Sequence, residues 1–438
     1  MSDAPRRRRS PAPGFRRARA MAVAAALGAS AAQAQTQGRA HARTQARAPA
    51  PRDSLVISVL TMGPGNEVFE RFGHVSIRVH DLRTGTDSAY NWGMFSFDQP
   101  RFLQRFLTGD TKYWMQGFPT LPLVNAYRRD GRWVVEQELG LRPEQKDSLR
   151  RFIERNALEA NKWYRYDYYR DNCATRVRDA IDLVLGGAFR REVVAREHGV
   201  TYRSETIRLA TAFPLLNYGM DFALGRPADD TMSAWEEMFI PMRLREHLYA
   251  VRVRGTDGTL GRLVTHERTL VADLRYAERP TPPDYLWPAL RVGLGVAGVL
   301  LLLTRLAGRS RGARAGIVTL GATWHLLAGV AGVLILCAGL FTRHAYMARN
   351  TNVLLGTPAS LALALLIPFL LARAPHARLV RAVRSLGAFA AACAVVVVGL
   401  RFFPPLAQEN RPLLALAVPI EAALAFALWR ATAPWEGA

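Results

Sequence analysis

Residues 166–179 read YDYYRDNCATRVRD, and this stretch decides how the soluble half of the chain is interpreted. Its aromatic beginning predicts a strand over Tyr164–Tyr168, and the residues that follow predict a helix over Cys173–Leu185. Cys173 then stands at the start of that helix, with the preceding Asp-Asn pair available as its cap. The helix dipole and the free N–H groups of the first turn are expected to lower the pKa of this thiol and to bind a developing oxyanion.

The chain contains three cysteines, at positions 173, 337 and 393. The latter two fall inside long apolar runs, where cysteine commonly serves as a packing residue. Cys173 is the only cysteine before these runs, so an internal disulfide is impossible in that part of the chain. A single cysteine in an exported domain is either inert and buried or a reactive thiol.

A histidine about a hundred residues upstream is the natural partner of this thiol. The segment FGHVS opens a predicted strand over residues 73–80, in which polar and apolar side chains alternate. A thiol nucleophile needs a base, and His74 at hydrogen-bond distance would supply one. A third polar group usually orients such a histidine. Asn91 and Tyr90, on the return strand Ser88–Trp92 of an expected hairpin, are the candidates for that role.

Simpler interpretations exist for the same residues. Residue types alone favour a buried core cysteine for Cys173 and a hydrogen-bonded strand histidine for His74. A zinc site needs three or four Cys, His or acidic ligands. One cysteine among scattered histidines does not predict such a site, so we expect neither a metal nor an organic cofactor.

The N-terminal region has the pattern of an export signal. Residues 1–34 combine a basic stretch, a short apolar core at Met21–Ser30 and an Ala-Gln-Ala cleavage site. An uncleaved anchor is the alternative, although the apolar run is short for a span. Residues 35–53 lack apolar periodicity and predict a disordered basic linker. The net charge of +22 is concentrated in this leader and in loops between apolar runs, which indicates a membrane surface and no nucleic-acid partner.

Five apolar runs in the C-terminal third predict membrane spans near residues 287–304, 315–341, 353–372, 385–403 and 411–430. Loops 305–314 and 373–384 hold four arginines each, whereas loops 342–352 and 404–410 hold two in all. The positive-inside rule places the arginine-rich loops in the cytoplasm, so residues 54–285 lie outside. The export signal predicts the same side. We therefore expect a protein of the bacterial cytoplasmic (inner) membrane whose N-terminal domain lies in the periplasm.

The segment between the linker and the spans, residues 54–275, mixes strand and helix patterns and predicts an α+β domain. Further strands are expected over residues 55–60, 132–139, 249–254 and 261–265, and further helices over residues 101–107, 121–129, 143–157 and 235–248.

Three segments resemble the signature of one family. They are FGHVSIR at 72–78, YNWG at 90–93 and DNCATRVRD at 171–179, which are similar to segments of the Lnb-type N-terminal periplasmic domain. The resemblance covers roughly residues 55–250, and in that family several transmembrane helices follow the exported domain. The family is similar to permuted papain-like thiol enzymes of the lecithin–retinol acyltransferase and NlpC/P60 kind. This resemblance implies a permuted papain-like thiol-hydrolase domain, followed by an all-α bundle of about five transmembrane helices over residues 286–431.

The resemblance also implies an activity. A named member of the family is a lipoprotein intramolecular transacylase, which moves an acyl chain from the glyceryl thioether of a lipoprotein to its N-terminal amine. Carried over to this chain, Cys173 is the acyl-accepting nucleophile and His74 is its base, in the same order along the chain as in the family. The role of Asn91 as the residue that orients His74 is our inference from the expected strand pairing.

Three residues near Cys173 are candidates for contact with a substrate. Arg176 shares the helix face of Cys173 and would hold a carboxylate or a phosphate head group, with an ion pair to Asp179 or Asp182 as the alternative. Asn172 and Tyr166 flank the cysteine on its N-terminal side. The tyrosines of this stretch would line an acyl groove, although packing in the core is the simpler explanation.

The expected function is therefore that of a membrane-bound, periplasm-facing thiol acyltransferase or hydrolase acting on a lipid-linked or lipoprotein substrate. One alternative is a cell-wall peptide amidase or endopeptidase that uses the same cysteine and histidine. The other is a non-catalytic envelope sensor or scaffold whose cysteine is structural.

Overall fold

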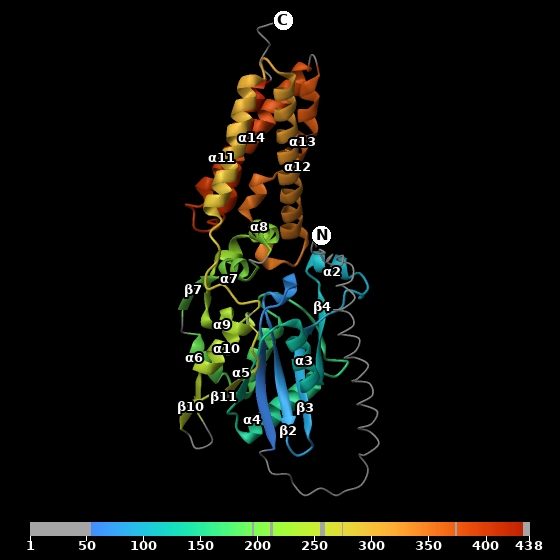
Figure 1. Ribbon diagram of the computed structural model, residues 1–438, viewed down its shortest axis with the longest axis vertical. Helices are drawn as coiled ribbons and strands as arrows, with labels where there is room; N and C mark the ends of the chain where they lie inside the picture. Colours follow the sequence, from blue (N-terminus) through green and yellow to red (C-terminus); the bar gives the residue numbers. More distant parts are fainter. Residues whose placement is uncertain are drawn as a thin grey trace, which may run out of the picture. The chain divides into compact units, whose positions relative to one another are not determined.

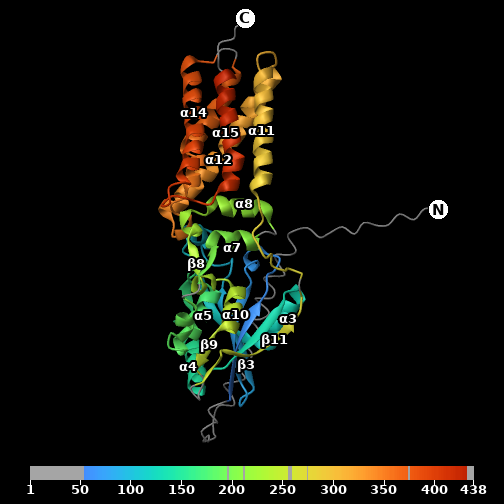
Figure 2. The same cartoon turned by 90° about the vertical axis from the view of Figure 1, so that its left-hand side faces the viewer.

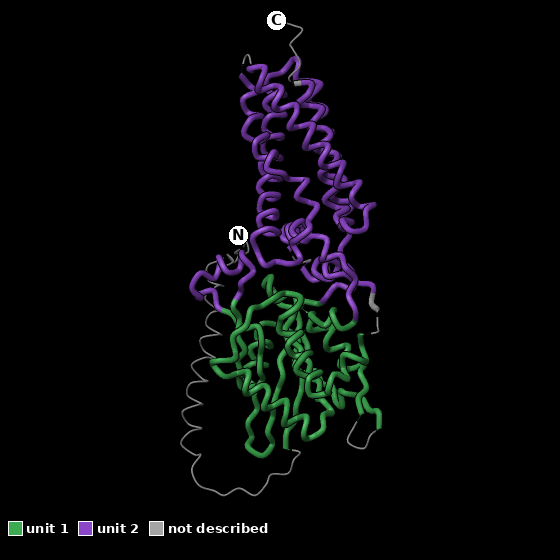
Figure 3. The backbone as a smooth tube through the Cα atoms, turned by 180° about the vertical axis from the view of Figure 1, so that it is seen from behind, with its two compact units in different colours: residues 1–95, 112–196, 234–277 green, residues 96–111, 197–233, 278–438 purple. Residues whose placement is uncertain are grey.

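The computed structural model describes residues 54–194, 197–210, 213–254, 259–273, 275–372 and 375–431. The predicted export signal and linker lie outside these residues. Within them the chain forms two compact units (Figure 3). The first takes its residues from 1–95, 112–196 and 234–277, and the second from 96–111, 197–233 and 278–438.

The first unit is built on a seven-stranded sheet in which every neighbouring pair is antiparallel. The strand order is β11-β5-β1-β2-β3-β4-β6 (Figure 1). The strands are β1 (Leu55–Met62), β2 (His74–Asp81), β3 (Thr86–Met94), β4 (Lys112–Pro119), β5 (Val134–Leu139), β6 (Trp163–Arg165) and β11 (Val264–Val271). A separate short pair consists of β9 (Arg252–Arg254) and β10 (Leu260–Arg262).

Helices cover both faces of this sheet. They are α3 (Thr120–Asp130), α4 (Pro143–Asn156), α5 (Cys173–Val184), α6 (Ala188–Val193), α9 (Ala234–Glu237) and α10 (Pro241–Ala250). On one face α4, α5 and α10 pack over the alternate residues of the strands, such as Ile57, Val75 and Ile77, to form the main core. On the other face α3 packs at one end, where Leu123 meets Leu60. The α+β interpretation is confirmed.

Three predicted elements are wrong. The strand expected over residues 261–265 is the end of β10 and the start of β11, which belong to different sheets. The strand expected over Tyr164–Tyr168 ends at Arg165, because Asp167 begins a turn: its Oδ1 accepts from the N–H groups of residues 169 and 170, each at 3.0 Å. The single helix expected over residues 235–248 is two helices, α9 and α10. Pro241 is the first residue of α10 and has no N–H with which to continue α9.

The second unit contains five helical segments that are long and apolar enough to cross a membrane. They are Leu286–Leu306, Arg311–Phe341, Thr351–Leu371, Ala377–Leu400 and Arg411–Arg430, and they confirm the five predicted runs. Four are single helices: α11 (Leu286–Leu306), α12 (Arg311–Phe341), α14 (Ala377–Leu400) and α15 (Arg411–Ala431). The third is assembled from the short helices η5 (Thr351–Leu355), α13 (Pro358–Leu366) and η6 (Ile367–Leu371).

Shorter elements complete the second unit. They are α2 (Phe102–Thr108), β7 (Glu197–Thr201), α7 (Tyr202–Leu209), α8 (Pro214–Ala223), η3 (Arg226–Asp229), β8 (Thr231–Ser233) and η4 (Ala345–Met347). In Figure 2, α8 runs across the ends of the long helices, so this segment belongs to the base of the helical bundle.

Candidate active site

Cys173 is the first residue of α5, as the sequence predicts, and Asn172 fixes that helix start. The Asn172 Oδ1 accepts from the N–H groups of Ala174 and Thr175, each at 2.9 Å, and Thr175 Oγ1 returns the contact by accepting from the N–H of residue 172 at 2.8 Å. The Asn172 side-chain amide donates to the carbonyls of Tyr168 and Phe239, both at 2.9 Å. Asn172 is buried, and its cap bonds confirm the predicted capping role, whereas its bonds to the two carbonyls were not predicted.

The Cys173 thiol is buried among aromatic and aliphatic side chains. Burial raises its pKa to about 11, although backbone N–H groups of Val75 and Ala174 act in the opposite direction by hydrogen bonding toward the sulfur. The prediction of a lowered thiol pKa is therefore wrong. The helix start is present, but the loss of hydration on burial outweighs it.

Gly93 lies next to Cys173. It lies at an irregularity in the pairing of β3 with β4 and has φ +89°. A Cβ added at this position would lie 3.5 Å from the Cβ of Cys173 and 3.7 Å from the ring of Tyr166. These are ordinary van der Waals distances, so the positive φ is what favours glycine at this position.

His74 begins β2, and Asn91 on the adjacent strand β3 holds its ring. The His74 Nε2 and Asn91 Oδ1 are 3.1 Å apart, and the Asn91 amide nitrogen donates to the Ala89 carbonyl at 3.0 Å. Because this second bond identifies the Asn91 oxygen as the acceptor, Nε2 carries the hydrogen and Nδ1 keeps the free lone pair of a base. The predicted pairing of these two residues is found in the structure.

The charge state of His74 follows from its surroundings. Burial, reinforced by the positive charge of Arg132, lowers its pKa to about 4, while the bond to Asn91 acts in the opposite direction. Arg132 is itself fixed by Glu70 at 3.0 Å and by the Gly63 carbonyl at 2.9 Å. Sequence reasoning missed Arg132, because nothing in the local pattern places it near residue 74.

Cys173 lies near the start of β2, the strand whose first residue is His74. Side chains alternate along a strand, so His74 leaves the sheet on the face opposite to Val75, which shares the main core with Cys173. The N–H of that same Val75 points toward the sulfur. The structure thus brings the thiol to the residue next to His74, at the end of the strand.

Arg176 has a carboxylate partner, but a different one from either predicted alternative. It forms a two-pronged ion pair with Asp171, with bonds of 2.6 and 2.8 Å, and its guanidinium lies 3.8 Å from the centre of the Tyr164 ring. Tyr166 stacks on Tyr113 with 4.3 Å between the ring centres. The aromatic stretch therefore forms one wall beside Cys173.

The described residues contain no group of three or more His, Cys, Asp or Glu side chains with the geometry to hold a metal ion.

Comparison with known families supports the same organisation. Residues 43–210 match the Lnb N-terminal periplasmic domain, and residues 288–431 match the Lnb transmembrane domain. Searches of curated proteins and of solved structures found no match to the chain. The two matched regions occur in the order that the sequence segments predicted, with the exported domain first. The chain therefore belongs to the Lnb family and is a multi-pass bacterial membrane protein with a periplasmic N-terminal domain.

Proposed function

We propose that the protein is a thiol acyltransferase or hydrolase that acts through Cys173 and His74 on a lipid-linked or lipoprotein substrate at the periplasmic face of the inner membrane. The observation that carries the proposal is the position of the thiol. It lies at a helix start, against the N–H of the residue that follows His74, and the His74 ring is held by Asn91 through Nε2.

The two pKa values define how the reaction begins. A thiol with a pKa of about 11 and an imidazole with a pKa of about 4 are both neutral at pH 7. The thiol proton therefore passes to Nδ1 of His74 during attack, as general-base catalysis, instead of being lost beforehand.

The chemical steps follow from these roles. The Cys173 sulfur bonds to the carbonyl carbon of an acyl ester, and the carbonyl oxygen becomes an oxyanion near the N–H of residue 173. Collapse of this intermediate breaks the ester C–O bond, leaves a thioester on Cys173, and returns the proton from the imidazolium to the departing alcohol. An amine or water then attacks the thioester, His74 accepts its proton, and that proton passes to the sulfur, which regenerates the thiol.

The membrane unit favours a lipid-linked substrate. Five spans hold the enzyme at the bilayer, where ester-linked acyl chains are present. A soluble cell-wall peptide does not require such an attachment.

The test traps the thioester. The full-length protein is incubated with a diacylated lipopeptide whose N-terminal amine is blocked by acetylation, so that the acyl group has no amine acceptor. Intact-protein mass spectrometry should then find one added acyl chain that hydroxylamine removes. The Cys337→Ser/Cys393→Ser double variant retains only Cys173 and should give the same adduct, whereas Cys173→Ser should give no hydroxylamine-labile adduct.

Two results would count against the proposal. Release of peptide fragments from purified cell wall, without any acyl adduct, would favour the amidase alternative. If Cys173→Ala accumulated normally and supported the full cellular phenotype, both catalytic interpretations would fail, and a sensor or scaffold role would remain.

A further inference from the structure

The helix α8 in the second unit has an inverted amphipathic pattern. Leu215 on its outer side is 87% exposed, whereas the polar side chains of Asn217 and Asp221 are buried. A helix that faces water shows the opposite arrangement. With apolar side chains outward, α8 is suited to lie in the interface of a bilayer, and it runs across the ends of the spans (Figure 2).

The loop between the last two spans lies at the same end of this unit. Residues 401–410 connect α14 to α15, on the side opposite to the arginine-rich cytoplasmic loops. Phe402 is 85% exposed and Phe403 is 55% exposed. Exposed aromatic side chains at the end of a span are typical of the level of the lipid head groups.

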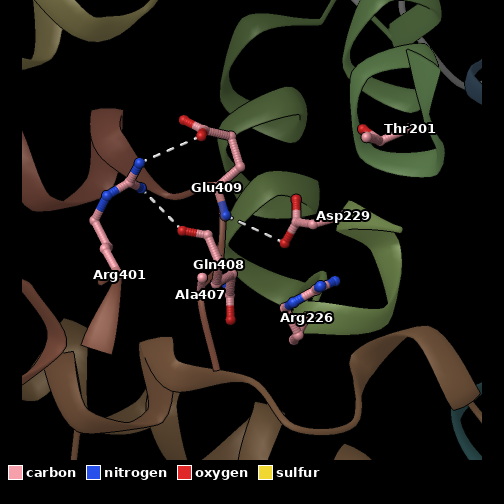
Figure 4. Close-up of a pocket in the computed structure, with 7 residues that line it drawn as sticks. All are labelled: Thr201, Arg226, Asp229, Arg401, Ala407, Gln408 and Glu409. Carbon is pink, nitrogen blue, oxygen red and sulfur yellow. Dashed lines mark hydrogen bonds and ion pairs between the residues drawn. The ribbon is translucent and has the colours of Figure 1, made fainter. Parts of the chain in front are cut away.

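A pocket lies between this loop and η3, the helix that follows α8 (Figure 4). Its volume is about 260 Å³, which suits a small polar group better than a whole drug-sized ligand. The lining residues are Thr201, Arg226, Asp229, Arg401, Ala407, Gln408 and Glu409. Arg401 contacts Glu409 at 3.3 Å, and the N–H of residue 409 donates to Asp229 at 3.2 Å.

A buried polar network supports the pocket wall. Gln408 accepts from the N–H of Thr351 at 2.9 Å and donates to the Leu224 carbonyl at 3.0 Å. The Asn350 amide donates to two carbonyls at the end of α8, those of Phe222 and Ala223, each at 2.9 Å. Because the buried amide of Gln408 is paired on both of its polar atoms, the wall is fixed before any ligand arrives.

The charges around the pocket balance. The cations are Arg203, Arg226, Arg401 and Arg411, and the anions are Asp221, Asp229, Asp230 and Glu409, which ion pairs connect to one another. Of the residues that line the pocket, two are cations (Arg226 and Arg401) and two are anions (Asp229 and Glu409), so the lining carries no net positive charge to attract an anion alone. A ligand with one phosphate and one ammonium adds no net charge. Its phosphate can pair with an arginine of the pocket and its ammonium with a carboxylate.

The lining residues also indicate which type of ammonium group the pocket would bind. Quaternary ammonium groups are usually held by aromatic rings, and none of the described residues that line the pocket is aromatic. Carboxylates such as Glu409 instead accept hydrogen bonds, which a primary ammonium donates and a trimethylammonium cannot.

We propose that the pocket between η3 and residues 401–410 binds the phosphoethanolamine head group of a membrane phospholipid. The guanidinium groups of Arg226 and Arg401 hold the phosphate, and Glu409 holds the ammonium. The exposed aromatic side chains beside Arg401 and the outer leucines of α8 contact the acyl region. This binding does not depend on acyl transfer at Cys173.

Native mass spectrometry of the full-length protein tests this site. The protein in detergent receives equal amounts of phosphatidylethanolamine, phosphatidylcholine and phosphatidylglycerol with identical acyl chains. Phosphatidylethanolamine should be retained in preference to the other two lipids. Replacing both arginines in the Arg226→Gln/Arg401→Gln variant should weaken its retention about tenfold or more, because bonds to a charged phosphate are lost.

Two further variants separate recognition from folding. Glu409→Gln keeps the shape of the side chain and should remove the preference for phosphatidylethanolamine over phosphatidylcholine while lipid is still retained. Arg305→Gln, which removes an exposed arginine at the cytoplasmic end of α11, should leave that preference unchanged. Equal retention of all three lipids, or a preference for phosphatidylglycerol, would overturn the proposal. Binding of soluble glycerophosphoethanolamine as tight as that of the lipid would mean that the ligand is not a membrane lipid.

Discussion

Replacing Asn172 by alanine removes four hydrogen bonds at the start of α5 at once. Two are the cap bonds from the N–H groups of Ala174 and Thr175, and two are the bonds to the carbonyls of Tyr168 and Phe239. Loss of a helix cap costs about 1 kcal/mol. Each buried carbonyl left without a donor costs about 1 kcal/mol more. We therefore expect Asn172→Ala to destabilise the start of the helix by about 3 kcal/mol.

Hydrogen exchange measures this loss where it occurs. Peptides that cover Ala174 and Thr175, from the full-length protein in detergent, should exchange about 100-fold faster in the variant, since 1.4 kcal/mol corresponds to a factor of ten. Peptides from the spans should not change. The local readout is preferable to global unfolding, because a chain with two units does not unfold in a single step.

Two controls sharpen the result. Asn172→Ser retains a cap oxygen but loses both donors to the carbonyls, so it should fall between the wild type and the alanine variant. Asn161→Ala removes an exposed side chain with a single bond, to the Arg155 carbonyl, and should have a small effect. If Asn172→Ala lost activity with unchanged exchange, Asn172 would contact the substrate and our structural interpretation would be refuted.

Three further predictions concern the site and its frame. The pH–rate profile should be flat between about pH 5 and 9 and should fall as the pH drops toward 4, where His74 takes up a proton; a limb near pH 6.5 would contradict the neutral Cys173–His74 pair. Asn91→Ala should lower kcat about tenfold with little change in KM, because the imidazole loses the acceptor that orients it; an effect confined to KM would assign Asn91 to substrate binding. Gly73→Ala should destabilise the protein by about 2 kcal/mol or more in a thermal unfolding assay, because the φ of Gly73 is +74° and an added Cβ would lie 2.9 Å from the Met62 carbonyl oxygen. Gly85 has a similar φ of +71° but open space around it, so Gly85→Ala should destabilise the protein less in the same assay.

Local sequence patterns were sufficient for much of the fold. The alternation in residues 73–80 has a period of two, which is typical of a strand, and β2 buries Val75, Ile77 and Val79 on one face. Ser76 on the other face is buried as well, which the alternation does not predict. The start of α5 was visible because an Asp-Asn pair precedes Cys173. The membrane runs are even more local, since length and apolar composition are enough to identify them.

Contacts between distant parts of the chain could not be predicted from local sequence patterns. The carbonyl of Phe239, which completes the bonding of Asn172, is 67 residues away in sequence. Arg132, which lies two residues before β5, lowers the pKa of His74, although no sequence motif connects the two residues. The raised pKa of the Cys173 thiol also depends on distant parts of the chain. A helix start is a local feature, whereas burial depends on side chains from several strands and helices. Local reasoning therefore predicted the position of Cys173 correctly and the direction of its pKa shift wrongly.

If the protein has the proposed activity, the raised pKa of Cys173 has a consequence in the periplasm. A thiolate reacts readily with oxidants, whereas a protonated and buried thiol does not. With no second cysteine in the exported part of the chain, no disulfide within that part could protect the sulfur. In the proposed mechanism, keeping the proton on sulfur until an acyl carbonyl and His74 are both in place would preserve the nucleophile and confine its reactivity to the bound substrate. The cost of the proposed mechanism is a larger barrier to proton transfer, which the fixed His74–Asn91 pair and the N–H groups at the strand and helix starts would reduce.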